Sequence, residues 1–132
     1  MTISKTTAHH AVFAGKRRRF CLRLGEIAEL EQLCGAGVGL ITKRLARGEF
    51  KNADVRESIR LGLVGGENDD LSPGLVDAMV ERYVDGRPVL ENLHLAQSII
   101  AALMDGVEES ARQMPGKSEE ERSDFRETSP PL

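Results

Sequence analysis

The chain has few aromatic residues. It contains no tryptophan, one tyrosine and four phenylalanines among its 132 residues. Aromatic side chains form the platforms on which bases and sugars stack, so their scarcity argues against a stacking surface for either ligand. Hydrophobic residues nevertheless make up 40% of the sequence, which is enough for one domain with an aliphatic core.

Long apolar runs and export signals are also lacking. No segment approaches the roughly 18 apolar residues of a membrane span, and the first ten residues, MTISKTTAHH, contain no apolar signal stretch. The two cysteines, Cys21 and Cys34, are too few for a disulfide framework, so we expect two buried, reduced thiols. The sequence therefore predicts a soluble, cytoplasmic protein that does not contact membranes.

Patterns for catalysis and metal binding are missing as well. His9, His10, Cys21 and Cys34 could formally supply four zinc ligands, but no CxxC or HxxxH spacing is present. No histidine, cysteine or pair of carboxylates has a spacing typical of a nucleophile, a general base or a metal-bound water. We expect no enzymatic activity, no cofactor and no metal.

Charge is distributed unevenly along the chain. The formal net charge is −3, but residues 1–64 carry +6 and residues 65–132 carry −9. Such asymmetry indicates either an interaction surface or a solvated surface on which charges segregate.

The stretch FAGKRRRFCLRLGEIAELEQLCGAG contains four consecutive cations, residues 16–19. Alternation of Phe20, Leu22 and Leu24 predicts a strand, with residues 11–13 as its partner and Gly15 in the turn. Two of the cations, Lys16 and Arg17, then fall at the hairpin tip. Arg19 and Arg23 fall on the solvent face of the second strand. The alternative is a basic arm that grips nucleic acid, which would require more basic residues on one face.

Helical periodicity begins after Leu24 and recurs in several segments up to about residue 113. The pattern predicts a first helix after Leu24 that ends at the glycines of CGAGVGL and a second over about 38–47. It also predicts a third helix capped by Asn52 and a fourth that starts with Ser72 and Pro73. The glycines of CGAGVGL fit a helix C-cap and a tight corner better than a phosphate loop, because a helix and not a strand precedes them. The loop GGENDDLS is expected to be a solvated connector, because its acids lack the spacing of an EF-hand. The fold class is therefore mainly α (α+β), with an N-terminal β-hairpin followed by a bundle of about five helices.

The last helix, predicted over about 89–113, is the most informative element. Its apolar face is wider than the stripe of an ordinary surface helix, so it is either the central helix of the bundle or a surface that meets another protein. For the second case the predicted partner-binding residues are Leu95, Ile99, Ile100, Leu103, Met104 and Val107.

The domain organisation follows from these patterns. Residues 1–10 are expected to be a flexible N-terminus and residues 11–113 a single hairpin-plus-helix domain. Residues 114–132, which include PGKSEEERSDFRETSPPL, have three prolines and no apolar period, so we expect a disordered acidic tail.

The chain resembles the small tail protein family of gene transfer agents and phages, whose members are described as tail assembly chaperones or as tail tube proteins. The resemblance rests on FAGKRRRFCLRLGEIAELEQLCGAG, LITKRLARGEF, ADVRESIRLGLVGG and LVDAMVERYVDGRPVLENLHLAQSIIAALMDG, and it covers about residues 12–106. It implies a nonenzymatic role in tail morphogenesis, with residence in the cytoplasm or in a phage-like particle. For a chaperone it implies the tape measure protein as client.

Three functions stay open on the sequence. The first is a tail assembly chaperone that binds the tape measure protein through apolar helix surface, and the second is a structural tail tube component that forms a homo-oligomer. The third is a helix-turn-helix DNA-binding module in LITKRLARGEFKNADVRESIRL, although its turn is long and the rest of the chain is acidic. Its phosphate contacts would come from Lys43, Arg44, Arg47, Lys51, Arg56 and Arg60.

Overall fold

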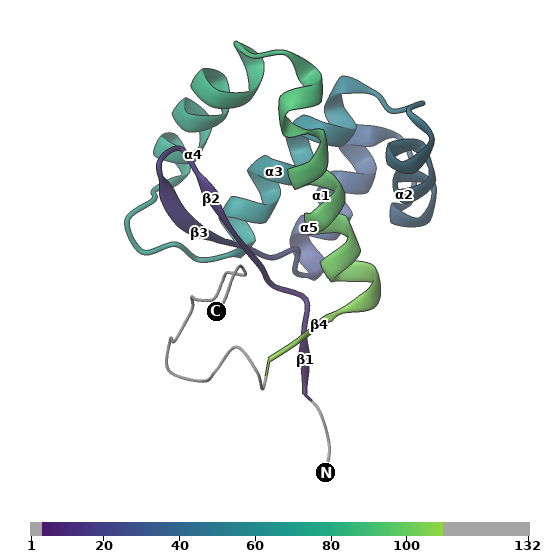
Figure 1. The fold of residues 1–132 in the computed structure, drawn as a ribbon, viewed down its shortest axis with the longest axis horizontal. Coiled ribbons are helices and arrows are strands. Elements are labelled where there is room, and N and C mark those ends of the chain that lie inside the picture. The colour runs from purple at the N-terminus through teal and green to yellow at the C-terminus, as the bar shows by residue number, and fades with distance from the viewer. Residues whose placement is uncertain (1–3, 110–132) are drawn as a thin grey trace, which may run out of the picture. The chain divides into compact units, whose positions relative to one another are not determined.

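A computed structural model describes residues 4–109 (Figure 1). These residues form five α-helices, two short helical turns and two pairs of strands, which confirms the mainly α fold class with an N-terminal hairpin. The elements in chain order are β1 (Lys5–Thr6), β2 (His9–Phe13), β3 (Lys16–Phe20), α1 (Leu24–Cys34), α2 (Val38–Arg47), α3 (Asn52–Gly65), α4 (Pro73–Val80), the π-helical turn η1 (Glu81–Asp85), the 3-10 turn η2 (Val89–Asn92), α5 (Leu93–Asp105) and β4 (Val107–Glu108).

The described chain divides into two units. One contains the antiparallel pair of β1 and β4, in which Lys5 lies opposite Glu108 and Thr6 opposite Val107. The other, Thr7–Gly106, contains the hairpin and all the helices. The predicted acidic tail, residues 114–132, lies outside the described residues.

The hairpin of β2 and β3 forms as predicted, with a two-residue turn at Ala14 and Gly15. Both turn residues have positive φ, 56° and 81°, which matches the type I′ geometry that the twist of a hairpin favours. β2 begins at His9, two residues earlier than expected, because His9 pairs with Phe20 and His10 with Arg19. The aromatic rings of Phe13 and Phe20 meet edge to face, with centroids 6.1 Å apart, and both side chains are buried in the core.

The end of the second strand differs from the prediction. β3 ends at Phe20, Arg23 occupies the cap of α1, and Leu24 is 86% exposed instead of sharing the buried face of Phe20 and Leu22. The cause is Glu26, whose carboxylate accepts the backbone N–H of Arg23 at 3.0 Å and so starts the helix there.

The loop GGENDDLS is exposed at Glu67, Asp69 and Asp70, as expected of a solvated connector, but it also bonds to the hairpin. The Asn68 side chain accepts the Arg19 N–H at 3.0 Å and donates to the Arg19 carbonyl at 2.9 Å. Asp70 binds the guanidinium of Arg18 at 2.6 Å and the amine of Lys16 at 3.0 Å. Arg18 is therefore 7% exposed, and these hydrogen bonds lower the pKa of Asp70 to about 2. The loop holds the hairpin in place.

The helix boundaries follow the predicted caps closely. Gly35 and Gly48 end α1 and α2 in the left-handed conformation, and the Ser72 hydroxyl accepts the Leu75 N–H at 3.2 Å. One cap moves by a residue: Asn52 is the first residue of α3, and the cap is Lys51, whose N–H donates to the Asp54 carboxylate at 2.9 Å.

α3 is the central helix, and it packs against α1, α4, α5 and β3 (Figure 1). The alternative that the last helix is central is therefore wrong. Glycine allows β3 to approach α3 closely: a Cβ atom built on Gly65 would lie 1.9 Å from the Cys21 carbonyl oxygen. Within this contact the Cys21 N–H donates to the Gly62 carbonyl at 2.9 Å.

α5 is shorter than predicted. It spans Leu93–Asp105 and not 89–113, because Gly106 takes φ 79° and ψ 165° and the chain continues as β4. Its N-terminal side is a separate 3-10 turn, η2, that follows Pro88. The apolar residues Val89 and Leu90 consequently lie outside the helix.

Candidate partner-binding surface

The six predicted partner-binding residues do not form one exposed face. Ile99 and Ile100 are buried in the core, and Leu95 and Leu103 are partly buried against it. Met104 is 48% exposed, and Val107 lies in β4 opposite Thr6. Whether any of the six contacts a partner stays a prediction, but Ile99 and Ile100 serve the core of the domain.

A groove lies between α2 and α5. It has a volume of about 340 Å³, and the small side chains Ala46 and Ala101 are exposed on it. Its lining is mostly apolar and consists of Thr42, Leu45, Ala46, Gln97, Ile100, Ala101, Met104 and Asp105. Two of the predicted residues, Ile100 and Met104, thus belong to an open groove that also includes residues of α2.

One hydrogen bond joins the two helices at the groove, and a second lies within α2. The Gln97 amide donates to the Leu45 carbonyl at 3.0 Å, and the Thr42 hydroxyl donates to the Val38 carbonyl at 2.7 Å. These bonds occupy the Gln97 amide N–H and the Thr42 hydroxyl, so the rest of the lining is mostly apolar. The groove carries one acid at the α5 end, Asp105.

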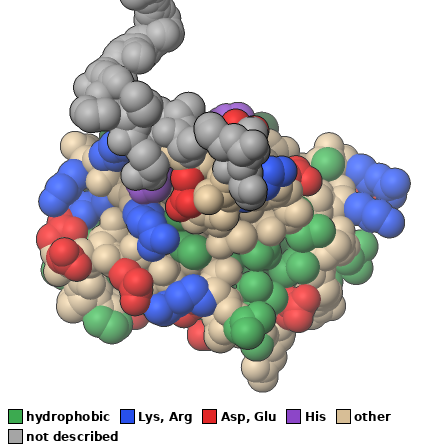
Figure 2. All heavy atoms as spheres, turned by 90° about the horizontal axis from the view of Figure 1, so that it is seen from below, with side chains coloured by type: hydrophobic (Ala, Val, Ile, Leu, Met, Phe, Trp, Pro, Cys, Tyr) green, Lys and Arg blue, Asp and Glu red, His purple; other side chains and the backbone are tan. Residues whose placement is uncertain are grey.

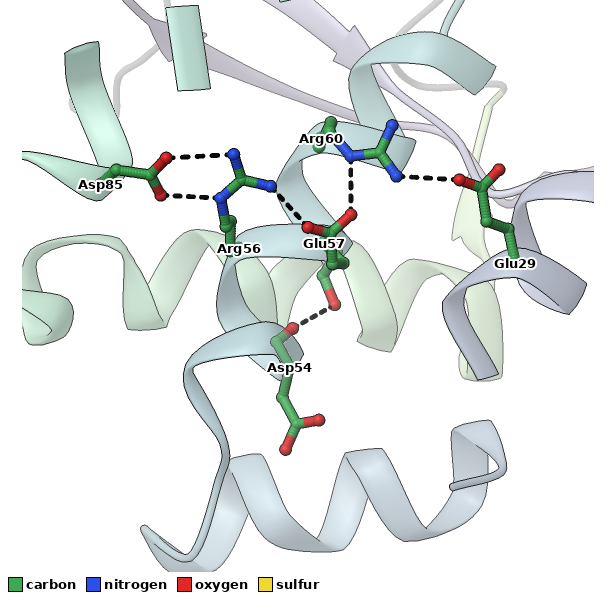
Figure 3. A network of polar contacts seen from close by, with 7 residues as sticks. Glu29, Asp54, Arg56, Glu57, Arg60 and Asp85 are labelled. Atoms are coloured by element: carbon green, nitrogen blue, oxygen red, sulfur yellow. Dashed lines mark hydrogen bonds and ion pairs between the residues drawn. The ribbon is translucent and has the colours of Figure 1, made fainter. Parts of the chain in front are cut away.

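An ion-pair network on α3 ties this helix to its neighbours (Figure 3). Arg56 binds Asp85 of η1 through two bonds of 2.8 and 3.0 Å. Glu57 accepts from Arg56 and from Arg60, each at 2.6 Å, and Arg60 also reaches Glu29 of α1 at 3.0 Å. The network therefore links α1, α3 and η1, and Glu57 is buried at its centre.

A second polar cluster ties α2 to α3. Asp54 is fully buried and accepts from the Arg44 guanidinium at 2.7 Å, and the same guanidinium donates to the Cys34 carbonyl at 3.1 Å. Burial, and then the neighbouring Asp54 carboxylate, raise the pKa of the Cys34 thiol to about 12. This cluster positions α2, and with it one wall of the groove. In the sequence, the feature that could have indicated this cluster is the acid Asp54 at the third position of α3.

The helix-turn-helix alternative does not fit this arrangement. Its second helix would be α3, which is surrounded by other elements, and Arg44, Arg56 and Arg60 are held in ion pairs within the domain. A recognition helix must reach base edges in the major groove of DNA. The exposed cations Lys43 and Arg47 remain on α2.

Exposed apolar residues also occur elsewhere. Leu24, Leu90 and Val12 are the most exposed of the large apolar side chains in the described part of the chain. Figure 2 shows hydrophobic side chains gathered among charged ones on the face seen from below, and Lys and Arg side chains at the edge of that view. The sequence pattern alone did not predict these exposures, because they depend on which neighbour covers each face of a helix or strand.

Residues 4–109 also bear on the expectations for metal binding and membrane spanning. No group of three or more histidine, cysteine or acidic residues in this range is arranged to hold a metal ion. Both cysteines are free and buried, as predicted. None of the helices in the same range is long and apolar enough to cross a bilayer.

Comparison with known proteins identifies the family. Residues 6–106 match the model of the family described as "Phage tail tube protein, GTA-gp10", and this range covers the hairpin and all five helices. No curated protein and no solved structure gave a significant match. The family is one of structural tail proteins and not a class of enzymes. The chain therefore belongs to this phage and gene transfer agent tail family.

Proposed function

We propose that this protein is a tail assembly chaperone that binds an apolar helical segment of the tape measure protein in the groove between α2 and α5. The observation that carries the proposal is the groove itself, which is open, mostly apolar and about 340 Å³ in volume. Grooves of this kind bind amphipathic helices through a few apolar anchors. The client is the one that the family resemblance implies.

The composition of the groove supports a helical client. Ala46 and Ala101 leave space for the side chains of an incoming helix, and Met104 at the rim has a flexible, polarisable side chain that adapts to different partners. The walls of the groove are already positioned by the contacts of Gln97 and Arg44, so binding of a client needs little rearrangement of the domain.

Coexpression with the tape measure protein tests the proposal. Ala101→Glu places a charge in the groove at an exposed position, and we expect it to reduce copurification by at least about tenfold, as truncation or blocking of an interface anchor does. Leu24→Glu is the matched control, because it makes a similar change at an exposed residue of α1. Equal copurification of the Ala101→Glu protein and the wild type would refute capture by this groove.

A structural role in the tail tube is the second candidate. The description of the family, which names a tail tube protein, favours it. The longest strands within residues 4–109, β2 and β3, have five residues each, which limits the sheet that one subunit offers to a ring. Quantitative mass spectrometry of purified particles separates the two roles: a tube subunit is present in many copies per particle, and a chaperone is absent.

A further inference from the structure

The helix α2 carries unpaired positive charge. Its sequence, VGLITKRLAR, contains three cations and no acid. Arg44 is bonded to the buried Asp54. Lys43 and Arg47 are exposed, and their side chains form no ion pair or hydrogen bond within residues 4–109. These two cations are therefore available to a partner.

Lys43 and Arg47 lie beside the lining of the groove between α2 and α5. Residues three or four apart are neighbours on a helix surface, so Thr42 and Ala46, which line the groove, form one row along α2. Lys43 and Arg47 form the next row, and Lys43 is three residues from Ala46. On the other side of the lining row Leu45 is buried in the core. The cations thus flank the groove on its solvent side.

The other wall of the groove carries the opposite charge. The sequence of α5, LHLAQSIIAALMD, contains no lysine or arginine, and its one carboxylate is Asp105. Asp105 is exposed, lines the groove, and has no ion pair or side-chain hydrogen bond within residues 4–109. The groove is therefore bordered by cations along α2 and by a carboxylate along α5.

The positions of these charges in their helices differ in an informative way. The C-terminal end of a helix carries partial negative charge, which favours cations and disfavours carboxylates. Local helix stability therefore accounts for Arg47, the last residue of α2. It does not account for Asp105, which is the last residue of α5 and has no cation within ion-pair distance in the described part of the chain. A cation supplied by a partner would relieve this unfavourable placement.

We propose that the groove selects a client helix whose two flanks carry opposite charges. Carboxylates would lie along Lys43 and Arg47, and a lysine or arginine would lie at Asp105. The apolar anchors between the two flanks would contact Ala46 and Ala101. The charges also fix the direction in which the client lies, because reversing a helix in a groove exchanges its flanks. This proposal rests on the proposed function, since it assigns the charge pattern of the helix that the groove binds.

The test uses the full-length protein and three fluorescein-labelled helical peptides of about 18 residues, or five turns. The peptides share one row of leucines at helical spacing. The mixed peptide has glutamates on one flank of this row and lysines on the other, and the remaining two have only lysines or only glutamates on both flanks. By fluorescence anisotropy we expect the mixed peptide to bind about threefold or more tightly than either of the others. The difference should shrink in about 0.5 M salt, because exposed charges are then screened.

Charge reversal on one wall distinguishes recognition from a structural effect. The double variant Lys43→Glu, Arg47→Glu makes both walls acidic, so it should prefer the all-lysine peptide to the mixed peptide by about threefold or more. A variant that was merely less stable would lose affinity for all peptides without inverting their order. Arg17→Glu, which changes an exposed cation of β3, is the matched control and should keep the wild-type order.

The results also separate this proposal from the proposed function. If Ala101→Glu abolishes binding of all three peptides but the double variant keeps the wild-type order, the groove binds helices and the charge pattern is refuted. Absence of binding at millimolar peptide would also refute the charge pattern, whereas the proposed function depends on how Ala101→Glu affects copurification of the tape measure protein. A peptide-free dimer that the double variant dissociates would assign the two charges to a second copy of the chain and overturn the proposal.

Discussion

The contact between β3 and α3 makes a sharp prediction for Gly65. A Cβ atom at this position would lie 1.9 Å from the Cys21 carbonyl oxygen and 2.8 Å from the Glu26 carboxylate. Neither neighbour can move freely, because the Cys21 backbone is bonded to Gly62 and the Glu26 carboxylate holds the cap of α1. Gly65→Ala must therefore push β3 and α3 apart by about 1 Å or more, since side chains in such an interior are already close-packed.

The magnitude follows from two costs. Overpacking of a close-packed interior costs about 1–3 kcal/mol, and the hydrogen bond from Cys21 to Gly62 contributes about 1 kcal/mol if it is lost. We expect Gly65→Ala to lower the free energy of unfolding by about 2–4 kcal/mol and the Tm by about 10–20 °C for a domain of this size.

Gly39→Ala is the matched control. Gly39 lies in the first turn of α2, and a Cβ atom there would meet no atom within 4 Å. Alanine has the higher helix propensity and a smaller entropy cost on folding, so this variant should be more stable by about 0.5 kcal/mol. Urea denaturation followed by circular dichroism measures both variants. A Gly65→Ala protein as stable as the Gly39→Ala protein would refute the close approach of β3 to α3.

Three further predictions concern the polar groups of the domain. The pKa of the Cys34 thiol is about 12, so iodoacetamide at pH 8 should leave this residue unmodified in the folded protein and alkylate it in urea, which mass spectrometry of the peptides detects. The folded-state pKa of Asp70, about 2, lies below its ordinary value of 3.8; the ion pair with Arg18 thus stabilises the fold fully above pH of about 4 and loses its effect as the pH falls through about 2. Asp70→Asn should lower the Tm at pH 7 and flatten its decrease across this window, and an unchanged pH profile would contradict the ion pair. Glu57→Gln removes the carboxylate that joins Arg56 to Arg60. It should lower the free energy of unfolding by about 1–3 kcal/mol, because two partly buried guanidinium groups lose a charged acceptor. A loss below about 0.5 kcal/mol, measured by urea denaturation, would show that Asp85 and Glu29 are sufficient partners for the two arginines.

The candidate site was predicted only in part. The wide apolar pattern of the last helix indicated either a central helix or a partner surface, and it could not distinguish the side that meets α3 from the side that borders α2. Ile99 and Ile100 are adjacent in the sequence and both are buried in the core, but only Ile100 also lines the groove, together with the exposed Met104. The contribution of α2 to the groove was missed, because Ala46 and Thr42 carry no periodic apolar signal.

Local sequence determined where most elements begin and end. Gly15, Gly35 and Gly48 take positive φ values, and the Ser72 hydroxyl caps α4 through its own neighbours. These features depend on bonds and steric limits within a few residues, so a single sequence specifies them. Tertiary structure alone decided the rest: that Arg18 is buried against Asp70, that α3 and not α5 is central, and that Gly65 lies against a strand. Each of these depends on residues that are more than 40 positions apart or on different elements, and periodicity contains no information about which distant partner covers a given face.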